Sequence, residues 1–397
     1  MRAAISLVTF TCLFAGPASS SQDGRKGGKD WPVGRTYELK GTRVTLSAPV
    51  LVARSKGFLW FPTLIRFDNG DLLAVMSDQP DEHHTTWTAQ ITWSLDGGLT
   101  WTEPKGAPYT ENPVRRANGD FLMLPFALFP RPGGMGAPYT LVRKGSRDVQ
   151  VVKEGVTVTG WPRPDEPPEK TGRSGFVFNG QTVELRKGGY LATLHGLFKG
   201  SKRYSLVAAE SADGVKWKVR SVIADENCKV EGSEGPCEAA MCRLKDGRLM
   251  CVFRVGINVP YGQAWSSDEG RTWSEAVAIK GAFSVQPSLA VLKDGRVVLG
   301  GGRAGLLAWF DVDGVGLGWE ALDVGAHHNG FQPKDAIARV DATFAGADQT
   351  SSYTEVVALD EKHLLYLYDR IPHGWAAVPK DSEETNSVWV IRVRLGD

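Results

Sequence analysis

Short runs of alternating apolar and polar residues recur along the chain, in pairs that flank glycine-containing turns. One pair occupies residues 235–254, with its turn at Asp246-Gly247. Asp-Gly between two such runs is typical of a β-hairpin, because a type I′ turn needs positive φ at both central positions. The hairpin places Glu238 at the start of one strand and Arg254 at the end of the next. Both therefore lie at its open end.

This hairpin pattern occurs six times. The turns fall near Gly70, Gly119, Gly188, Gly247, Gly295 and Glu361. Their mean spacing is about 58 residues, enough for four short strands in each repeat, and no long segment has a helical period. We therefore predict an all-β fold, a six-bladed β-propeller of four-stranded antiparallel blades. Strands at 42–51 and 388–394 are expected to pair in one blade and close the ring.

A second motif, Ser-x-Asp-x-Gly-x-Thr-Trp, follows several of the hairpins and is known as the Asp-box. Copies occupy 94–101 and 266–273, a copy one residue shorter occupies 211–217, and a worn copy occupies 311–319. The aspartate accepts backbone N–H bonds in a turn, the glycine takes positive φ, and the tryptophan packs between layers. These aspartates are expected to be structural, because a catalytic site would not be built several times on an outer rim.

The N-terminal residues resemble an export signal. Arg2 precedes an apolar run at 3–15 and small residues at 16–20, so 1–20 is predicted to be a signal peptide. Residues 21–41 are predicted to be a disordered lead-in and 42–397 a single propeller domain. The protein is then secreted or periplasmic.

Composition limits the partners. The net charge of +1 does not favour nucleic acid or an anionic membrane, and no later segment is long enough to span a bilayer. We expect a monomer that needs no cofactor and takes a glycan as its partner. Three segments, at 151–173, 325–331 and 373–386, are predicted to be loops. The pairs His83-His84 and His327-His328 are interpreted as solvated loop residues, since they lack the spacing of metal ligands.

Five cysteines are present, and Cys12 lies in the predicted signal peptide. The others, which include Cys228 and Cys237, lie within one short region. A two-residue turn at Asp246-Gly247 would place Cys242 directly opposite Cys251. A disulfide and two buried free thiols both fit this arrangement.

The hairpin-end residues, with the six repeats and the Asp-boxes, resemble the sialidase (neuraminidase) superfamily over nearly the whole mature chain. Glu238 and Arg254 are sixteen residues apart across an Asp-Gly-Arg turn, as in that family. Arg303 stands in an Arg-Ala-Gly-Leu context after the fifth hairpin, and Tyr353 opens the sixth. Asp81 stands in an Asp-Glu-His run after the first hairpin, similar to a run in some animal members.

The resemblance implies a role for each residue. Tyr353 would be the nucleophile, Glu238 its base, and Asp81 the acid/base, with Asp78 as the rival. Arg254 and Arg303 would bind a substrate carboxylate. In an unbroken strand pair Glu238 and Arg254 would point to opposite faces, so a β-bulge or a strand-end position is required.

One position departs from the family. Its first hairpin begins with Arg-Ile-Pro, and that arginine is one of three that hold the substrate carboxylate; here the position is Trp60. An indole offers one N–H and a large apolar face, so Trp60 is expected to bind substrate by stacking on a sugar.

Singly, each candidate residue has an ordinary structural explanation, such as a surface ion pair or a strand-end tyrosine. Jointly they predict an exported sialidase-like exo-glycosidase that removes a terminal, acidic sugar by a retaining mechanism. Two alternatives stay open. One is a lyase or hydrolase for uronic or neutral sugars on the same propeller, and the other is a non-catalytic propeller that binds glycans.

Overall fold

The computed structural model describes residues 30–82, 87–162, 175–256, 258–303, 305–338 and 351–396. The chain divides into two compact units, Met1–Asp30 and Trp31–Asp397, and all the described strands belong to the second. The predicted signal peptide at 1–20 and the pair His83-His84 lie outside the described residues. None of the described helices has the length and apolar character needed to cross a membrane.

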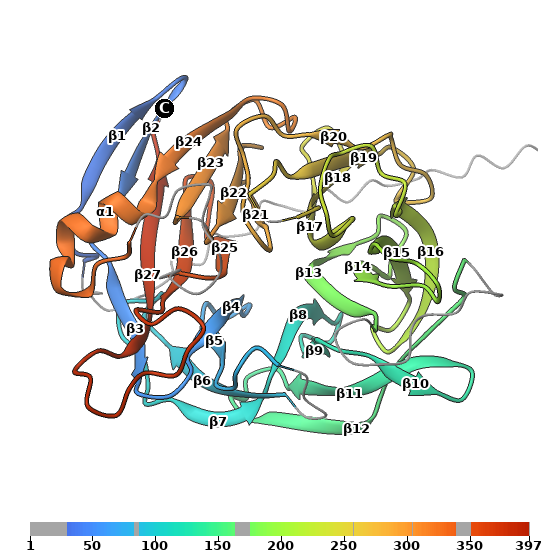
Figure 1. Cartoon of the computed structure of the whole chain (residues 1–397), viewed down its shortest axis with the longest axis horizontal. Helices are drawn as coiled ribbons and strands as arrows, with labels where there is room; N and C mark the ends of the chain where they lie inside the picture. Colours follow the sequence, from blue (N-terminus) through green and yellow to red (C-terminus); the bar gives the residue numbers. More distant parts are fainter. Residues whose placement is uncertain are drawn as a thin grey trace, which may run out of the picture. The chain divides into compact units, whose positions relative to one another are not determined.

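The unit Trp31–Asp397 is built almost entirely of antiparallel sheets arranged like the blades of a propeller (Figure 1). Three of the sheets are four-stranded. The first comprises β4 (Trp60–Arg66), β5 (Leu72–Ser77), β6 (Thr88–Ser94) and β7 (Lys105–Pro108). The second comprises β17 (Cys237–Arg243), β18 (Leu249–Arg254), β19 (Gly262–Ser266) and β20 (Val277–Ala278). The third comprises β21 (Ser288–Val291), β22 (Val297–Gly301), β23 (Leu307–Asp311) and β24 (Trp319–Asp323).

A nine-stranded sheet takes the place of two of the predicted blades. Its strands are β8 (Thr110–Arg115), β9 (Phe121–Pro125), β10 (Phe129–Arg131), β11 (Gly134–Val142), β12 (Val149–Thr159), β13 (Val177–Glu184), β14 (Tyr190–Gly196), β15 (Ser205–Ser211) and β16 (Lys216–Ala224). It contains two antiparallel groups, which a short parallel pairing of β12 with β16 joins at Val158 and Trp217. The described residues therefore form five sheets, not six separate ones. The loop predicted at 151–173 is wrong over its first part, because β12 continues to Thr159.

The chain ends share the remaining sheet. Its strands are β1 (Arg35–Leu39), β2 (Thr42–Leu46), β3 (Val50–Ser55), β25 (Thr354–Ala358), β26 (His363–Arg370) and β27 (Asn386–Leu395). β27 pairs with β26, β2 and β3, which confirms the predicted pairing of the two end segments. β1 pairs with β2, so the predicted disordered lead-in is wrong at 35–39.

One predicted loop is a helix. α1 (Val324–Phe331) begins where the Asp323 carboxylate accepts a hydrogen bond from Ala326 N, and the 3-10 turn η2 (Pro333–Asp335) follows it. His327 and His328 are buried, not solvated. Burial lowers the pKa of both rings, that of His328 to about 4, and each ring nitrogen has a hydrogen-bond partner. These two residues therefore join α1 to the closing sheet.

The first strand of each antiparallel group faces the centre of the ring. These strands are β4, β8, β13, β17, β21 and β25 (Figure 1). β25 contacts both β4 and β21, β17 contacts both β21 and β13, and β13 contacts β8. All six run the same way relative to their hairpin turns, so their first residues gather at one end of the ring and their turns at the other.

Five of the hairpin turns share one geometry, which differs from the predicted type I′ turn. In the hairpin of β17 and β18, Leu244 N donates to Arg248 O and Gly247 N donates to Leu244 O, and Gly247 has positive φ. This three-residue turn shifts the register by one residue. Cys242 consequently pairs with Met250, and Cys251 pairs with Met241. The predicted Cys242–Cys251 contact is wrong, and both residues are buried free thiols on opposite faces.

The Ser-x-Asp-x-Gly segments form turns that the aspartate closes. Asp268 accepts hydrogen bonds from the backbone N of Arg271 and Thr272 and from the hydroxyls of Thr272 and Ser266. Burial alone would raise its pKa, but these donors outweigh it and lower the pKa to about 2. The carboxylate therefore holds the turn and has no free oxygen for catalysis.

Replacement of Asp268 by alanine should lower the free energy of unfolding by about 2–3 kcal/mol, because several donors lose their acceptor. Asp313 is the control: it occupies the matching place in the worn copy, is exposed and has no hydrogen-bond partner among the described residues. Asp313→Ala should change stability by less than about 0.5 kcal/mol. Urea denaturation of both variants measures the difference, and equal losses would contradict the turn-closing role.

Candidate active site

The candidate residues lie at the end of the ring where the innermost strands begin. Glu238 is the second residue of β17, and Tyr353 directly precedes β25. Arg254 ends β18, and Asp81 and Arg303 follow β5 and β22. In an antiparallel hairpin the first strand begins where the second strand ends, so these residues converge although they come from separate sheets.

A β-bulge positions Glu238. Cys237 pairs with Arg254 and Ala239 pairs with Phe253, so Glu238 is an extra residue in β17. Its φ is 31°, a left-handed value that is uncommon for residues other than glycine. The bulge directs the Glu238 carboxylate toward the Arg254 guanidinium, which confirms the irregularity that the sequence requires.

Three other innermost strands are bulged at the matching place. Phe61 in β4 and Asn112 in β8 have φ of 50° and 53°, and Gly180 in β13 has φ of 64°. The strand register shifts at each of them. Backbone strain of this kind clusters at functional sites. The sequence held a signal for two of the bulges, because a proline follows both Phe61 and Asn112 and a proline inside a strand marks an irregularity.

Tyr353, Glu238 and Arg254 form one hydrogen-bonded group. The Tyr353 hydroxyl donates to Glu238 Oε1 at 2.5 Å, and Arg254 Nη1 donates to Glu238 Oε2 at 2.9 Å. Arg254 is 7% exposed, whereas Tyr353 and Glu238 are partly exposed. The two side chains that would perform chemistry are thus the ones that solvent can reach.

Burial and the neighbouring charges shift the pKa values of Tyr353 and Glu238 in opposite directions. Burial raises the pKa of Tyr353 well above its usual value, and the Glu238 charge raises it further. Burial alone would raise the pKa of Glu238, but the charge of Arg254 and the hydrogen bond from Tyr353 outweigh it, so that pKa is lowered. At neutral pH the phenol is therefore neutral and the carboxylate is ionised. A neutral phenol in contact with an ionised carboxylate is the arrangement that a tyrosine nucleophile and its base require.

Arg303 lies between two aromatic rings. Its Cζ is 4.5 Å from the ring centroid of Trp375 and 5.7 Å from that of Tyr353. It is 6% exposed, and its Nε has no hydrogen-bond partner among the described residues. Burial lowers its pKa, but a guanidinium stays protonated in proteins. Trp375 escaped the sequence analysis because it lies in a long loop without a strand pattern.

Trp60 does not take the place that its sequence position suggests. It is 1% exposed, stacks on Phe61 at 4.5 Å and contacts Phe58 at 5.2 Å. Its Nε1 donates to Gln79 O at 2.8 Å. The indole lacks the free face that stacking on a sugar requires. Instead the indole packs against Phe61, whose ring in turn packs against Tyr353 with the two ring centroids 4.7 Å apart.

The two acid/base candidates, Asp78 and Asp81, have different surroundings. Both carboxylate oxygens of Asp78 accept hydrogen bonds from β6, from Thr88 Oγ1 at 2.5 Å and Gln90 Nε2 at 2.7 Å. The charge of Asp81 acts instead on Arg303, where it opposes the lowering of the arginine pKa. This favours Asp81 over Asp78.

Several residues around the site have no signal in the sequence. Glu234 accepts a hydrogen bond from Arg254 Nη2 at 2.7 Å. His195 Nδ1 accepts the backbone N–H of Glu238 at 3.1 Å, and burial lowers its pKa to about 4, so the ring is neutral. His195 thus holds the backbone of the Glu238 bulge, and Glu234 holds the Arg254 side chain that Glu238 binds. Neither stands in a motif: His195 comes from a strand of another sheet, and Glu234 lies just outside the β17–β18 hairpin.

Asp369 fixes the backbone beside Tyr353. Its two carboxylate oxygens accept from Ser352 N at 2.6 Å and from Phe61 N at 3.1 Å. It is fully buried, and burial raises its pKa to about 6. Asp369 therefore links the first residues of β4 to the residue that precedes Tyr353.

Two more buried acids lie deeper in the ring. Glu111 accepts from the Tyr109 hydroxyl and from Gln286 Nε2, and Glu355 accepts from Gln181 and Ser288. Burial raises the pKa of each to about 7. Glu111 and Glu355 line a cavity of only about 10 Å³, so polar side chains close the centre of the ring.

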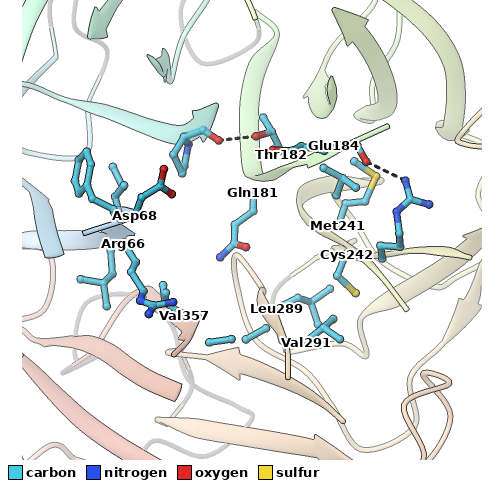
Figure 2. Close-up of a pocket in the computed structure, with 18 residues that line it drawn as sticks. Arg66, Asp68, Gln181, Thr182, Glu184, Met241, Cys242, Leu289, Val291 and Val357 are labelled. Carbon is cyan, nitrogen blue, oxygen red and sulfur yellow. Dashed lines mark hydrogen bonds between the residues drawn. The ribbon is translucent and has the colours of Figure 1, made fainter. Parts of the chain in front are cut away.

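A larger cavity of about 690 Å³ opens at the opposite end, near the hairpin turns (Figure 2). Apolar residues such as Leu289 and Val291 line much of it, and the side chain of Gln181 points into it. Its lining contains none of the candidate catalytic residues. The cavity is therefore separate from the site at Tyr353.

No family model and no curated protein matches this sequence. Among solved structures, it is similar to a protein of unknown function from Dyadobacter fermentans DSM 18053. That match has 18% identity and a TM-score of 0.66, and covers 89% of this chain and 99% of that one.

Other structural neighbours are glycoside hydrolases. The α-L-arabinanase of Penicillium chrysogenum complexed with arabinobiose has 13% identity and a TM-score of 0.57, over 87% of this chain and 98% of that one. The Hadza microbial sialidase Hz136 has 13% identity and a TM-score of 0.55, over 86% of this chain and 66% of that one. These matches show that the chain has the fold of propeller-type glycosidases.

The raised pKa of Glu111 predicts a pH-dependent stability. An ordinary glutamate pKa is about 4.5 and that of Glu111 is about 7, so the folded protein holds this proton more tightly than the unfolded chain. Its contribution is complete below about pH 4.5 and is lost as pH rises through 7. The free energy of unfolding of Glu111→Gln, measured relative to that of wild type, should therefore increase by up to about 3 kcal/mol as the pH rises from 4.5 to 8. Denaturation at several pH values measures this gain, and a constant difference would contradict it.

Proposed function

We propose that this chain is a sialidase-like exo-glycoside hydrolase that works with retention of configuration. It would act from a six-bladed propeller in which the nine-stranded sheet supplies two blades. The observation that carries the proposal is the 2.5 Å hydrogen bond from Tyr353 to Glu238. A tyrosine nucleophile is the known alternative to a carboxylate in sialidases. The two glycosidase neighbours, each at 13% identity, support the reaction class.

In the first step Glu238 accepts the phenolic proton while the Tyr353 oxygen bonds to the anomeric carbon. The bond from that carbon to the leaving oxygen breaks, and Asp81 in its acid form gives this oxygen a proton. Burial raises the pKa of the phenol, but the charges of Arg303 and Arg254 oppose this rise and so favour loss of its proton. The product of this step is an aryl glycoside, in which the anomeric carbon is bonded to the Tyr353 oxygen.

In the second step the Asp81 carboxylate accepts a proton from water, whose oxygen bonds to the anomeric carbon. The bond to Tyr353 breaks, and Glu238 returns its proton to the phenolate oxygen. Two inversions at one carbon give net retention. Each residue ends in its starting protonation state.

Export belongs to the same proposal. The predicted signal peptide at 1–20 supports a secreted or periplasmic protein that meets its glycan outside the cytoplasm. The mechanism uses no cofactor, because acid, base and nucleophile are all side chains of this chain.

Tyr353→Phe should reduce kcat by at least about 10³-fold, since the variant lacks only the attacking oxygen. Tyr190→Phe is the matched control, because the Tyr190 hydroxyl bonds Arg115 O at 2.9 Å outside the site. The assay is a panel of fluorogenic glycosides that includes a sialoside and an α-L-arabinofuranoside.

Full activity of Tyr353→Phe on any glycoside that wild type hydrolyses would contradict the nucleophile assignment. Binding of glycans by a wild type that hydrolyses none would instead support the non-catalytic propeller.

A further inference from the structure

Arg254 is already occupied by this chain's own carboxylates. Its Nη1 donates to Glu238 Oε2 at 2.9 Å, and its Nη2 donates to Glu234 Oε1 at 2.7 Å. A bidentate guanidinium–carboxylate pair needs two donors on one edge of the arginine. Here the two terminal nitrogens hold two different carboxylates, so a substrate carboxylate would have to compete with one of them.

Glu234 is held in this place by its backbone. Its N–H donates to Val255 O at 3.1 Å, and its carbonyl accepts from Tyr204 N at 2.8 Å. Its side chain is only 27% exposed. The carboxylate is thus part of the folded site and would remain beside Arg254 when a ligand enters.

The remaining charges also disfavour an anion. Trp60 stands at the sequence position where the sialidase pattern has a third arginine, but its side chain is buried and its N–H is bonded to Gln79 O. The two cations of the site, Arg254 and Arg303, already face the carboxylates of Glu234 and Glu238. The carboxylate of an acidic sugar would meet these like charges at short range. Like-charge contacts cost binding free energy and so select against an anionic ligand.

We infer that the terminal sugar this site takes is uncharged, a neutral glycoside whose hydroxyl oxygens accept from Arg303, and that Glu234 excludes carboxylate sugars. This inference rests on the proposed function and replaces the acidic sugar that the sequence predicts. A hydroxyl can accept from one guanidinium without displacing Glu234. Arg303 provides such a donor, because its guanidinium forms no hydrogen bond among the described residues, and only its backbone N and O are bonded.

Binding of N-acetylneuraminic acid to the mature protein tests the exclusion by calorimetry. Glu234→Gln keeps the shape of the side chain and removes its charge, so it should bind the acid at least about tenfold more tightly than wild type. Glu231→Gln is the control. It removes the same charge three residues away, at an exposed position without a contact to Arg254. It should bind the acid as wild type does.

Hydrolysis by wild type gives a second, independent readout. The kcat/KM of wild type should be higher for at least one neutral glycoside than for the sialoside. Glu234→Gln should lower the ratio of these two kcat/KM values. Equal affinity of wild type and a folded Glu234→Gln for the acid would overturn the inference. A higher kcat/KM of wild type for the sialoside than for every neutral glycoside would also overturn the inference, and this result does not depend on whether the variant folds. Absence of any hydrolysis would contradict the proposed function, while the binding comparison would still decide this inference.

Discussion

The Tyr353–Glu238 hydrogen bond depends on a backbone irregularity. In a regular strand Glu238 would project away from Arg254, and its carboxylate would not meet the arginine and the tyrosine together. The bulge at φ 31° turns it toward both. His195 accepts the backbone N–H of Glu238, and Asp369 holds the backbone beside Tyr353. Glu238 and Tyr353 are thus held by different sheets, so their contact depends on how those sheets pack around the ring.

The same end of the ring concentrates buried charge. Arg254 and Arg303 are buried, and the deeper acids Glu111 and Glu355 have pKa values raised by burial to about 7. Burial of charged groups costs stability through desolvation, so such groups cluster at functional sites. In this chain they surround Tyr353, whose hydroxyl donates to the ionised Glu238.

Much of this arrangement was predictable, because local pattern determines hairpins. Alternation and Gly-containing turns predict the β-fold, and the hairpin ends predict that Glu238, Arg254 and Tyr353 meet. The failures concern interactions that no local pattern encodes. A three-residue turn in place of a two-residue turn separates Cys242 from Cys251. Packing between segments buries Trp60, and the backbone bond from Glu234 N to Val255 O, just outside the β17–β18 hairpin, brings Glu234 to Arg254. The sequence carries no signal for either contact.

The central claim is that the Tyr353 oxygen forms the bond to the sugar. The most direct measurement is trapping of the intermediate with an activated fluoro-glycoside of whichever glycoside wild type hydrolyses fastest, followed by peptide mass spectrometry. The account predicts one added sugar per chain, on the peptide that contains Tyr353, with fragmentation that locates it on the phenol. A sugar located on Glu238 or Glu111 instead would show that a carboxylate is the nucleophile and would contradict the account.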